Sequence, residues 1–407
     1  MSGPLTGIRV LDLSRVLAGP WASQNLADMG AEVIKIEQPG QGDDTRGWGP
    51  PFTTPAPGDE KGVAAYFLSC NRAKKSVTVD LASAAGQALI RQLAARSDIV
   101  LENFKVGGLA KYGLDYAGLS AVNPQLIYCS ITGFGQTGPY ANRAGYDFLI
   151  QAMGGMMSIT GERDDRPGGG PQKAGMAMVD IMTGMYATVA ILGALHHRSQ
   201  GGGGQHIDLA LLDVQVAALG HQALNYLVSG EAPRRLGNAH PSIVPYQPFQ
   251  TQDGYIILAV GNDGQYARFC AVIGRPDLAL DGDFQTNTQR VHNRERLIAL
   301  LEPILATRTT DEWVAALEAH AVPCGPINTL DRVFADPQVQ ARGLRLDLEH
   351  ASLGHVPSVR SPIRYSATPL EFEHGPPTLG QHTDEVLREV LALSDTEIAT
   401  LRETGVV

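Results

Sequence analysis

The sequence predicts an α/β fold with a mainly parallel sheet, followed by a second, smaller domain. Two observations carry this prediction. Over the first 135 residues, short strand-like runs alternate with helix-like runs through short connections, and this order favours parallel strands with helices on both faces. The 407 residues are also enough for two domains, and the chain changes character near residues 231–235, where Pro233-Arg234-Arg235 indicates a linker.

The elements of the first half follow from periodicity. Strands are expected at 8–13, 32–37, 76–81, 98–101 and 126–131, with helices at 20–30 and from Ser83. The loop at residues 39–62, rich in Gly and Pro, has a length that is usually functional or mobile. A long apolar helix is expected after Asp180, then the break Gly201–Gly204, a strand at 206–209 and one long helix to about Gly230.

The second half contains three local signals. Asp253-Gly254 between apolar runs predicts a hairpin turn. Thr309-x-x-Glu312 and Ser394-x-x-Glu397 are capping boxes and predict two helix starts.

Composition excludes several classes of function. A net charge of −10 with no long basic run argues against non-specific binding of nucleic acid. The four cysteines are scattered without metal-ligand spacing, which suits reduced thiols in a cytosol-like compartment. The N-terminus lacks the regions of a signal peptide. The apolar window Met176–Leu195 contains Asp180 and two glycines, so a buried helix is expected there and no membrane span.

Asp180 is a single carboxylate at the head of an apolar segment, where ionisation needs support. One interpretation is a helix cap, because a carboxylate at a helix N-terminus accepts free N–H groups. The other is a catalytic nucleophile. The sequence has no G-x-S-x-G, no H-E-x-x-H and no evident Cys–His pair, so a carboxylate is the best nucleophile if the protein is an enzyme.

Two glycine-rich runs and a basic cluster are candidates for ligand binding. Gly133-Phe-Gly-Gln-Thr-Gly138 matches a dinucleotide fingerprint but follows the fifth strand and lacks the later acidic residue, so a structural loop is favoured. Gly201–Gly204 lacks a P-loop lysine and is expected to form a flexible surface turn. Arg72, Lys74, Lys75, Lys105 and Lys111 gather near strand ends and fit either phosphate binding or solvated surface charges.

The chain resembles the class III CoA-transferases nearly end to end. The motifs that carry the resemblance are Gly7-Ile-Arg-Val-Leu-Asp-Leu13, Ala18-Gly-Pro20, Gly30-Ala-Glu-Val-Ile-Lys-Ile-Glu37, Gly42-Asp-Asp-Thr-Arg46, Asn71-Arg72, Glu102-Asn-Phe104, Gly145-Tyr-Asp147 and Leu379-Gly-Gln-His-Thr383. Within that family the chain is most similar to the branch that moves CoA between succinyl-CoA and dicarboxylates, through the segments Arg143–Asp147, His240–Tyr246 and Arg290–Arg294.

The resemblance implies roles for particular residues. Asp180 matches the catalytic aspartate, and Asp147 an auxiliary acidic residue near the reacting groups. The positions that match the lining of the CoA site are Leu17, Ala18, Gln38, Arg72, Leu81, Asn103, Phe104, Lys105 and Lys111. His240, Arg143 and Arg235 are candidates for holding the distal carboxylate of a dicarboxylate. The mobile glycine loop of the formyl-CoA branch is replaced here by Gly237–Ser242.

These roles describe a CoA-transferase that forms an aspartyl anhydride and then an aspartyl-CoA thioester on Asp180, with an acyl-CoA, expected to be succinyl-CoA, as donor. Two alternatives stay open: a 2-methylacyl-CoA racemase, and a CoA-binding protein without catalysis. The racemase branch places a histidine where this chain has Tyr146, and racemisation needs an acid and a base on opposite faces of the carbon.

The resemblance also implies an architecture and a set of partners. A large CoA-binding Rossmann-like domain is expected at residues 1–230, a small α/β domain at 231–330, and a C-terminal segment at 331–407 that returns to the large domain. The subunits are expected to interlock as a homodimer. CoA thioesters and carboxylic acids are the expected substrates of a cytoplasmic enzyme with no permanently bound cofactor or metal, and with no nucleic-acid or membrane partner.

Overall fold

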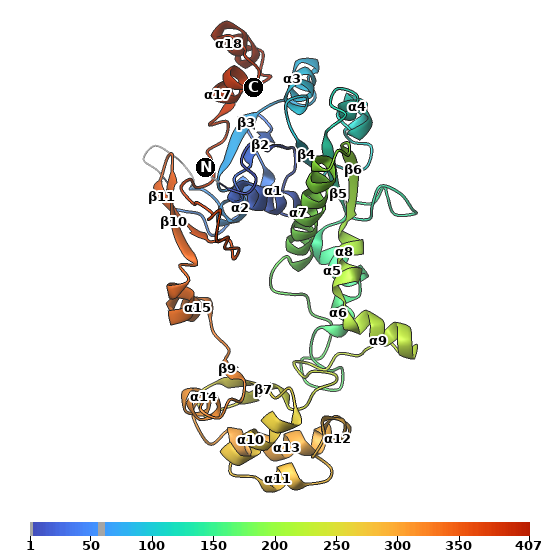
Figure 1. Ribbon diagram of the computed structural model, residues 1–407, viewed down its shortest axis with the longest axis vertical. Coiled ribbons are helices and arrows are strands. Elements are labelled where there is room, and N and C mark those ends of the chain that lie inside the picture. The colour runs from blue at the N-terminus through green and yellow to red at the C-terminus, as the bar shows by residue number, and fades with distance from the viewer. Residues whose placement is uncertain (1–2, 56–61) are drawn as a thin grey trace. The chain divides into compact units, whose positions relative to one another are not determined.

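A computed structural model describes residues 3–55 and 62–407 of the chain. It contains two compact units (Figure 1). The large unit comprises Met1–Met156, Ala174–Leu224 and Gln338–Val407, and the small unit comprises Met157–Lys173 and Asn225–Pro337. The small unit therefore includes residues 157–173, which the sequence places in the large domain because nothing in their composition sets them apart.

The large unit is built on a six-stranded sheet in the order β3-β2-β1-β4-β5-β6. Its strands are β1 (Arg9–Asp12), β2 (Glu32–Glu37), β3 (Lys74–Thr78), β4 (Ile99–Glu102), β5 (Ile127–Thr132) and β6 (Gln205–Ala210). Every pairing is parallel, as the alternation of elements predicts. The strand order reverses between β1 and β4, and open α/β sheets bind ligands beyond the carboxyl ends of the strands at such a point.

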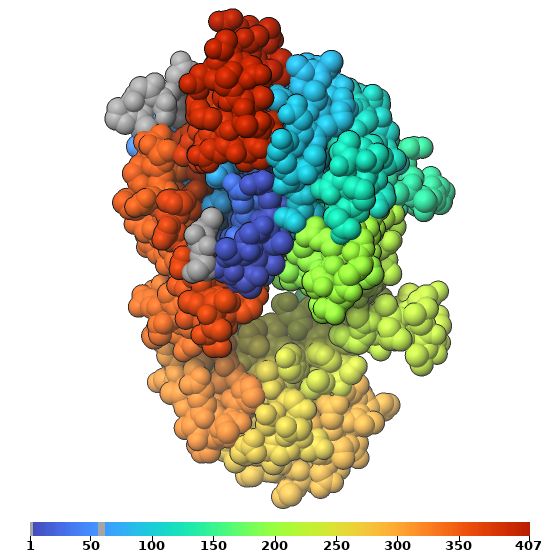
Figure 2. Space-filling view, turned by 45° about the horizontal axis from the view of Figure 1, so that its top comes forward, coloured from blue at the N-terminus to red at the C-terminus, as the bar shows by residue number. Residues whose placement is uncertain are grey.

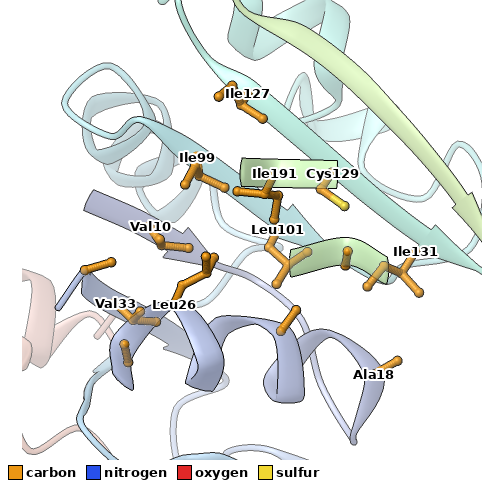
Figure 3. Packing of buried hydrophobic residues seen from close by; sticks show 14 of the residues in the cluster. Val10, Ala18, Leu26, Val33, Ile99, Leu101, Ile127, Cys129, Ile131 and Ile191 are labelled. Atoms are coloured by element: carbon orange, nitrogen blue, oxygen red, sulfur yellow. The ribbon is translucent and has the colours of Figure 1, made fainter. Parts of the chain in front are cut away.

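Helices cover both faces of this sheet, because the strands are apolar on both sides. Helices α1 (Ala18–Asp28) and α7 (Met178–Ser199) pack on one face, where Leu26 and Ile191 join Val10, Leu101 and Cys129 in one buried cluster (Figure 3). The other face is covered by α3 (Ala84–Ala94), α4 (Tyr116–Ser120) and α17 (Thr383–Glu389). Ser83 caps α3 by accepting a hydrogen bond from the N–H of Gly86.

Helix α7 is long and apolar enough to cross a membrane, with a mean hydropathy of 1.6. Ala187, Ile191 and Ala194 on one of its faces nevertheless belong to the buried cluster on the sheet. Met185, Tyr186 and Val189 on the same helix are exposed. The expected buried helix is therefore buried along one face only.

Two predictions about elements are wrong. Strand β3 spans Lys74–Thr78 rather than residues 76–81, because its backbone pairs with β2 over this range. The Lys74 ammonium is buried and donates to Asn71 Oδ1 at 2.9 Å and to the Pro20 carbonyl at 3.0 Å. The single helix expected up to about Gly230 is two helices, α8 (Leu211–Ala218) and α9 (His221–Ser229). They are separated at Gly220, whose φ of +53° no ordinary helical residue adopts.

The glycine-rich runs serve packing. A Cβ on Gly133 would lie 2.6 Å from the Cα of Gly145, and turns rather than a helix follow Gly133–Gly138 until α5 (Asp147–Met153) begins. In the second run, a Cβ on Gly204 would lie 2.3 Å from the Leu126 carbonyl oxygen. Gly204 is thus packed against the chain, whereas Gly201 and Gly203 are exposed in the expected surface turn.

The C-terminal segment belongs to the large unit from Gln338 onward. It forms the antiparallel hairpin β10 (Arg345–His350) and β11 (Gly354–Val359), then α17 and α18 (Asp395–Glu403). Val386 and Leu387 of α17 share a buried cluster with Leu89 and Leu93 of α3, and Figure 2 shows this segment, in red, beside the light-blue residues of α3.

The small unit has its own core around a three-stranded sheet in the order β7-β8-β9. Strands β7 (Tyr246–Gln250) and β8 (Tyr255–Ala259) form the predicted hairpin, and β9 (Cys324–Pro326) pairs with β8. The predicted capping box at Thr309 starts α14 (Thr310–Glu318), as the one at Ser394 starts α18 in the large unit. Five further helices lie wholly in the small unit: α10 (Asp263–Val272), α11 (Asp277–Leu280), α12 (Asn287–His292), α13 (Arg294–Leu305) and α15 (Leu330–Ala335).

Candidate active site

Asp180 is the third residue of α7, and it does not cap that helix. The N-cap is Ala177, which has no capping side chain. The carboxylate of Asp147 takes this role instead: its Oδ2 accepts hydrogen bonds from the N–H groups of Val179 at 2.7 Å and of Asp180 at 3.2 Å. The helix-cap interpretation of Asp180 is therefore wrong, and the cap comes from a residue 33 positions earlier.

Asp147 is itself held in place by the element that it begins. It is the first residue of α5, and its Oδ1 accepts a hydrogen bond from Gln151 Nε2 at 2.6 Å, one turn further along the helix. The amide oxygen of Gln151, which is fully buried, accepts from the N–H of Ala174 at 2.9 Å. Asp147 and Gln151 thus tie α5 to the segment that leads into α7, and they set the position of Asp180.

The Asp180 carboxylate is mostly buried and lacks a hydrogen-bond donor among the described residues. Burial raises its pKa to about 7, with a further contribution from the negative charge of Asp147. At neutral pH the group is therefore divided between its charged and neutral forms. A carboxylate that is poorly solvated and has no hydrogen-bond donor is less stabilised as an anion, and is therefore more reactive toward an electrophile.

Tyr66 lies within the electrostatic reach of Asp180. It belongs to α2 (Ala65–Cys70), and its ring packs edge-on against Trp48 with centroids 5.3 Å apart. Burial raises the pKa of Tyr66 to about 12, and the charge of Asp180 adds to this effect. Sequence reasoning missed Tyr66 because a single tyrosine after a Gly/Pro-rich loop carries no pattern.

Helix α1 approaches α7 closely beside Asp180. A Cβ on Gly184, one turn after Asp180, would lie 2.7 Å from the Ala18 carbonyl oxygen and 2.9 Å from the Cβ of Trp21. Leu17 and Ala18, predicted to line the CoA site, are buried at this start of α1. Only glycine permits this approach, so the Leu17–Ala18 turn lies next to the first turns of α7.

A pocket of about 520 Å³ lies beyond the carboxyl ends of β1, β2, β3 and β4. It brings together Gln38, Leu81 and Phe104 of the predicted CoA-lining set, with Arg15 and Tyr112 beside them. Asn103 lies at its edge and clamps the Arg15 backbone: its Oδ1 accepts from the Arg15 N–H at 2.9 Å, and its Nδ2 donates to the Arg15 carbonyl at 2.6 Å.

The predicted cations differ in their availability. Lys105 and Lys111 are exposed, and the ammonium of Lys111 lies 4.5 Å from the centroid of the Tyr112 ring. Arg72 is buried, and its guanidinium bonds to both carboxylate oxygens of Asp28, at 2.8 and 2.5 Å. It also donates to the Val359 carbonyl at 2.9 Å. Arg72 therefore serves to join α1 to the C-terminal hairpin.

The three candidates for the distal carboxylate lie in different units. Arg143 is in the large unit with Asp180, is exposed, and stacks over the rings of Phe134 and Tyr140 at 5.2 and 4.6 Å. No described carboxylate lies within salt-bridge distance of it. Arg235 and His240 are in the small unit. Arg235 forms an ion pair with Asp164, and His240 Nδ1 accepts a hydrogen bond from the N–H of Ser242.

A larger pocket, of about 730 Å³, lies near the amino ends of β2 and β3; it is lined by Lys74 and Lys75 of the basic cluster but by none of the positions matched to the CoA site. Within residues 3–55 and 62–407, no group of three or more His, Cys, Asp or Glu side chains is arranged to hold a metal.

Comparison with known proteins identifies the family. The sequence pattern of CoA-transferase family III matches residues 5–383. The chain is 54% identical over 393 residues to a succinate–glutarate CoA-transferase of Agrobacterium fabrum, covering 97% of each, and 46% identical over 404 residues to the human succinyl-CoA:glutarate CoA-transferase, covering 99% of this chain and 90% of that one. A crystal structure of a CAIB/BAIF family protein from Brucella suis matches with a TM-score of 0.85 and 51% identity, over 96% of this chain and 100% of that one. The chain belongs to CoA-transferase family III.

Proposed function

We propose that this member of CoA-transferase family III moves CoA from succinyl-CoA to a dicarboxylate such as glutarate, with Asp180 as the nucleophile. The single observation that carries the proposal is the state of Asp180: a carboxylate without a donor, with a pKa of about 7, at the closely packed meeting point of α1 and α7. The names of the Agrobacterium and human relatives support the substrate pair.

The reaction balances without any external reagent. The Asp180 carboxylate attacks the thioester carbonyl of succinyl-CoA, the C–S bond breaks, and a mixed anhydride and CoA thiolate form. The thiolate attacks the Asp180 carbonyl of the anhydride, which gives an aspartyl-CoA thioester and releases succinate. The incoming dicarboxylate attacks this thioester, and the thiolate returns to the new anhydride to form the product. Covalent catalysis thereby divides one difficult exchange into four easier steps.

Asp147 serves this reaction by positioning. Its carboxylate accepts hydrogen bonds from the N–H groups of Val179 and Asp180. These donors at the positive N-terminus of α7 are therefore not available to stabilise the Asp180 carboxylate. The Asp147 charge also disfavours ionisation of Asp180, which makes the ionised form a stronger nucleophile. These contacts support the proposal that Asp147 is an auxiliary residue that acts through Asp180.

The CoA portion is proposed to lie in the pocket formed by Gln38, Leu81 and Phe104, with the Leu17–Ala18 turn near the thioester. Lys105 and Lys111, which are exposed beyond this pocket, are proposed to meet the phosphates. Arg72 is left out of the direct contacts because Asp28 and Val359 already hold its guanidinium.

Arg143 is the proposed partner of the distal carboxylate. Among the three candidates it lies in the same unit as Asp180, and it keeps its guanidinium free of carboxylates while two aromatic faces hold it. Bidentate pairing with a planar carboxylate is the interaction to which arginine is best suited. His240 stays a second candidate, and Arg235 is disfavoured by its ion pair with Asp164.

The test is to incubate the purified protein with succinyl-CoA and a panel of mono- and dicarboxylates, and to identify new acyl-CoA species by mass. We expect a dicarboxyl-CoA product from the wild type and none from Asp180→Ala, which should still bind free CoA. Substantial turnover by Asp180→Ala would contradict the assignment of the nucleophile. CoA binding without transfer to any acid would indicate a non-catalytic CoA-binding protein.

Arg143→Leu tests the distal contact separately. We expect the KM for glutarate to rise at least tenfold, because one charge-assisted pair is lost, while the KM for a monocarboxylate of the same length changes little. Lys173→Leu is a matched control, since it removes an exposed cation from the small unit. Equal effects on both acids would remove Arg143 from the substrate site.

We also propose that the protein is a cytoplasmic homodimer. Apolar side chains of α5 and α7 are exposed on the large unit: Phe148, Met153, Met185, Tyr186 and Val189. Exposed apolar side chains on two helices that contact each other are typical of an interface with another protein, and a second copy of the chain is the partner that the family resemblance suggests.

A further inference from the structure

Val16 adopts a backbone conformation that is unusual for its residue type. Its φ is +71°, in the left-handed region, where a β-branched side chain is strained. Such strain persists only where surrounding contacts impose it, and it is concentrated at functional sites. Val16 joins the end of β1 to Leu17 and Ala18 at the start of α1.

Three segments impose this conformation. The carboxylate of Asp43 accepts the N–H of Val16, with both oxygens at 3.3 Å. The thiol of Cys70 donates to the Val16 carbonyl at 3.6 Å. On the preceding residue, Asn103 bonds to both the N–H and the carbonyl of Arg15. Hydrogen bonds thus hold the backbone of both Arg15 and Val16 in this turn.

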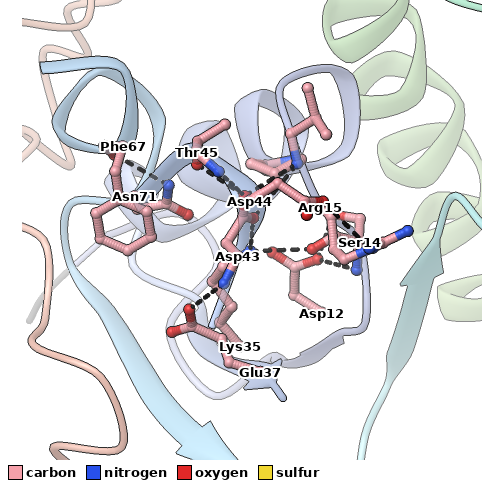
Figure 4. A network of polar contacts seen from close by, with 12 residues as sticks. Asp12, Ser14, Arg15, Lys35, Glu37, Asp43, Asp44, Thr45, Phe67 and Asn71 are labelled. Atoms are coloured by element: carbon pink, nitrogen blue, oxygen red, sulfur yellow. Dashed lines mark hydrogen bonds and ion pairs between the residues drawn. The ribbon is translucent and has the colours of Figure 1, made fainter. Parts of the chain in front are cut away.

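Asp43 is in turn fixed by an ion pair with no solvent access (Figure 4). Lys35 Nζ lies 2.8 Å from Asp43 Oδ2, and both side chains are completely buried. Lys35 also donates to the Ser14 carbonyl at 2.9 Å, and Thr45 donates to Asp43 Oδ1 through its N–H and its hydroxyl. Burial alone would raise the pKa of Asp43, but Lys35 and Thr45 outweigh it and bring the pKa to about 2. Asp43 therefore stays charged at every working pH.

A buried ion pair is weak support for stability, because desolvation offsets most of the attraction. A role in positioning explains better why it is present. The turn that Asp43 holds leads into Leu17 and Ala18. The Ala18 carbonyl oxygen lies close to Gly184, one helical turn after Asp180: a Cβ on Gly184 would be 2.7 Å from it.

We propose that the Lys35–Asp43 pair is a positioning device: by holding Val16 in the left-handed conformation, it places the Leu17–Ala18 turn against the catalytic end of α7. This inference rests on the proposed function, because that function assigns Leu17 and Ala18 to the acyl-CoA site. Lys35 and Asp43 belong to the wall of the pocket proposed for CoA, but their side chains are fully buried and act through Val16.

A double-mutant cycle with glycine tests the device. Asp43→Asn removes the charge that holds the Val16 N–H, and we expect kcat to fall at least 30-fold while the Kd for free CoA changes less than threefold. Val16→Gly alone should keep kcat within threefold, because glycine adopts positive φ without strain. Combined with Asp43→Asn, it should restore at least tenfold of the lost kcat.

The matched control is Ala392→Gly, which relieves another left-handed residue, with φ of +59°, in the C-terminal segment. It should not restore kcat. If Asp43→Asn does not fold, Lys35→Met with Asp43→Leu replaces the buried pair by apolar side chains, a change that proteins tolerate, and the same rescue by Val16→Gly is expected.

The outcomes separate this inference from the proposed function. A wild-type protein without transferase activity overturns the proposed function itself. An active wild type overturns the positioning device if Asp43→Asn keeps its kcat, or if Ala392→Gly rescues as well as Val16→Gly does. The positioning device is supported if Val16→Gly, but not Ala392→Gly, restores the kcat of Asp43→Asn without a matching change in melting temperature.

Discussion

At the scale of single residues, the proposed chemistry depends on the charge of the Asp180 carboxylate. Burial and Asp147 raise the pKa of Asp180 to about 7, against about 3.9 for a solvated aspartate. Only the ionised form attacks a thioester. The sequence points to this residue, with a helix cap as one of its two interpretations. The true cap of α7 is Asp147, and its contact with Val179 could not be predicted because the two residues are far apart in the chain.

The pH dependence of the reaction follows from this shift. A raised carboxyl pKa means that the group protonates as pH falls through about 7, so kcat/KM should fall about tenfold per pH unit below that value. Asp147→Asn removes the second contribution and should move this acid limb to lower pH, while burial, the larger contribution, keeps it above the solvated value. The measurement is kcat/KM for succinyl-CoA between about pH 5 and 8.5.

An acid limb that does not move in Asp147→Asn would show that the two carboxylates are not coupled.

At the scale of elements, the packing of α1 against α7 brings the site together. Gly184→Ala places a methyl group within 3 Å of the Ala18 carbonyl and the Trp21 side chain. We expect a loss of about 1–3 kcal/mol of unfolding free energy and a lower kcat, because the Leu17–Ala18 turn must move away from Asp180. Thermal or urea unfolding measures the first effect.

The same helix provides its own control. Gly193 is exposed, and a Cβ there would meet nothing within 4 Å. Gly193→Ala should raise stability by about 0.5–1 kcal/mol through helix propensity and leave kcat unchanged. If both substitutions destabilise to a similar degree, the close approach at Gly184 does not explain the effect.

Elements were predictable where the signal is local. The strand alternation, the hairpin at Asp253-Gly254 and the capping boxes at Thr309 and Ser394 were all confirmed, because each depends on neighbouring residues. The predictions failed at Lys74 and Gly220, where backbone pairing with β2 and a positive φ override the pattern. Tyr66 could not be predicted because only the folded chain brings it near Asp180, and no local pattern marks it.

At the scale of the whole molecule, the parallel sheet and the family were predictable, and the division into units was predictable only in part. The sequence places a boundary near residue 231, but the small unit also takes in residues 157–173. A chain that leaves one unit and returns has no compositional break at either crossing. For the same reason the sequence could not rank Arg143 and His240 as partners of the distal carboxylate, because it does not show that they belong to different units.

The proposed homodimer is the prediction that belongs to this scale. Val189 is 62% exposed on α7, a helix whose other face is the core of the large unit. A charge at this position would be desolvated in an interface without a partner, so Val189→Glu should shift the protein from dimer to monomer in sedimentation or light scattering. Leu280→Glu is the control: Leu280 is 78% exposed on α11 of the small unit, away from α5 and α7 in the chain. If the dimer interface keeps water away from the anhydride, the Val189→Glu monomer should also lose transferase activity, because the anhydride is then hydrolysed. A Val189→Glu protein that remains dimeric would exclude the α7 face from the interface.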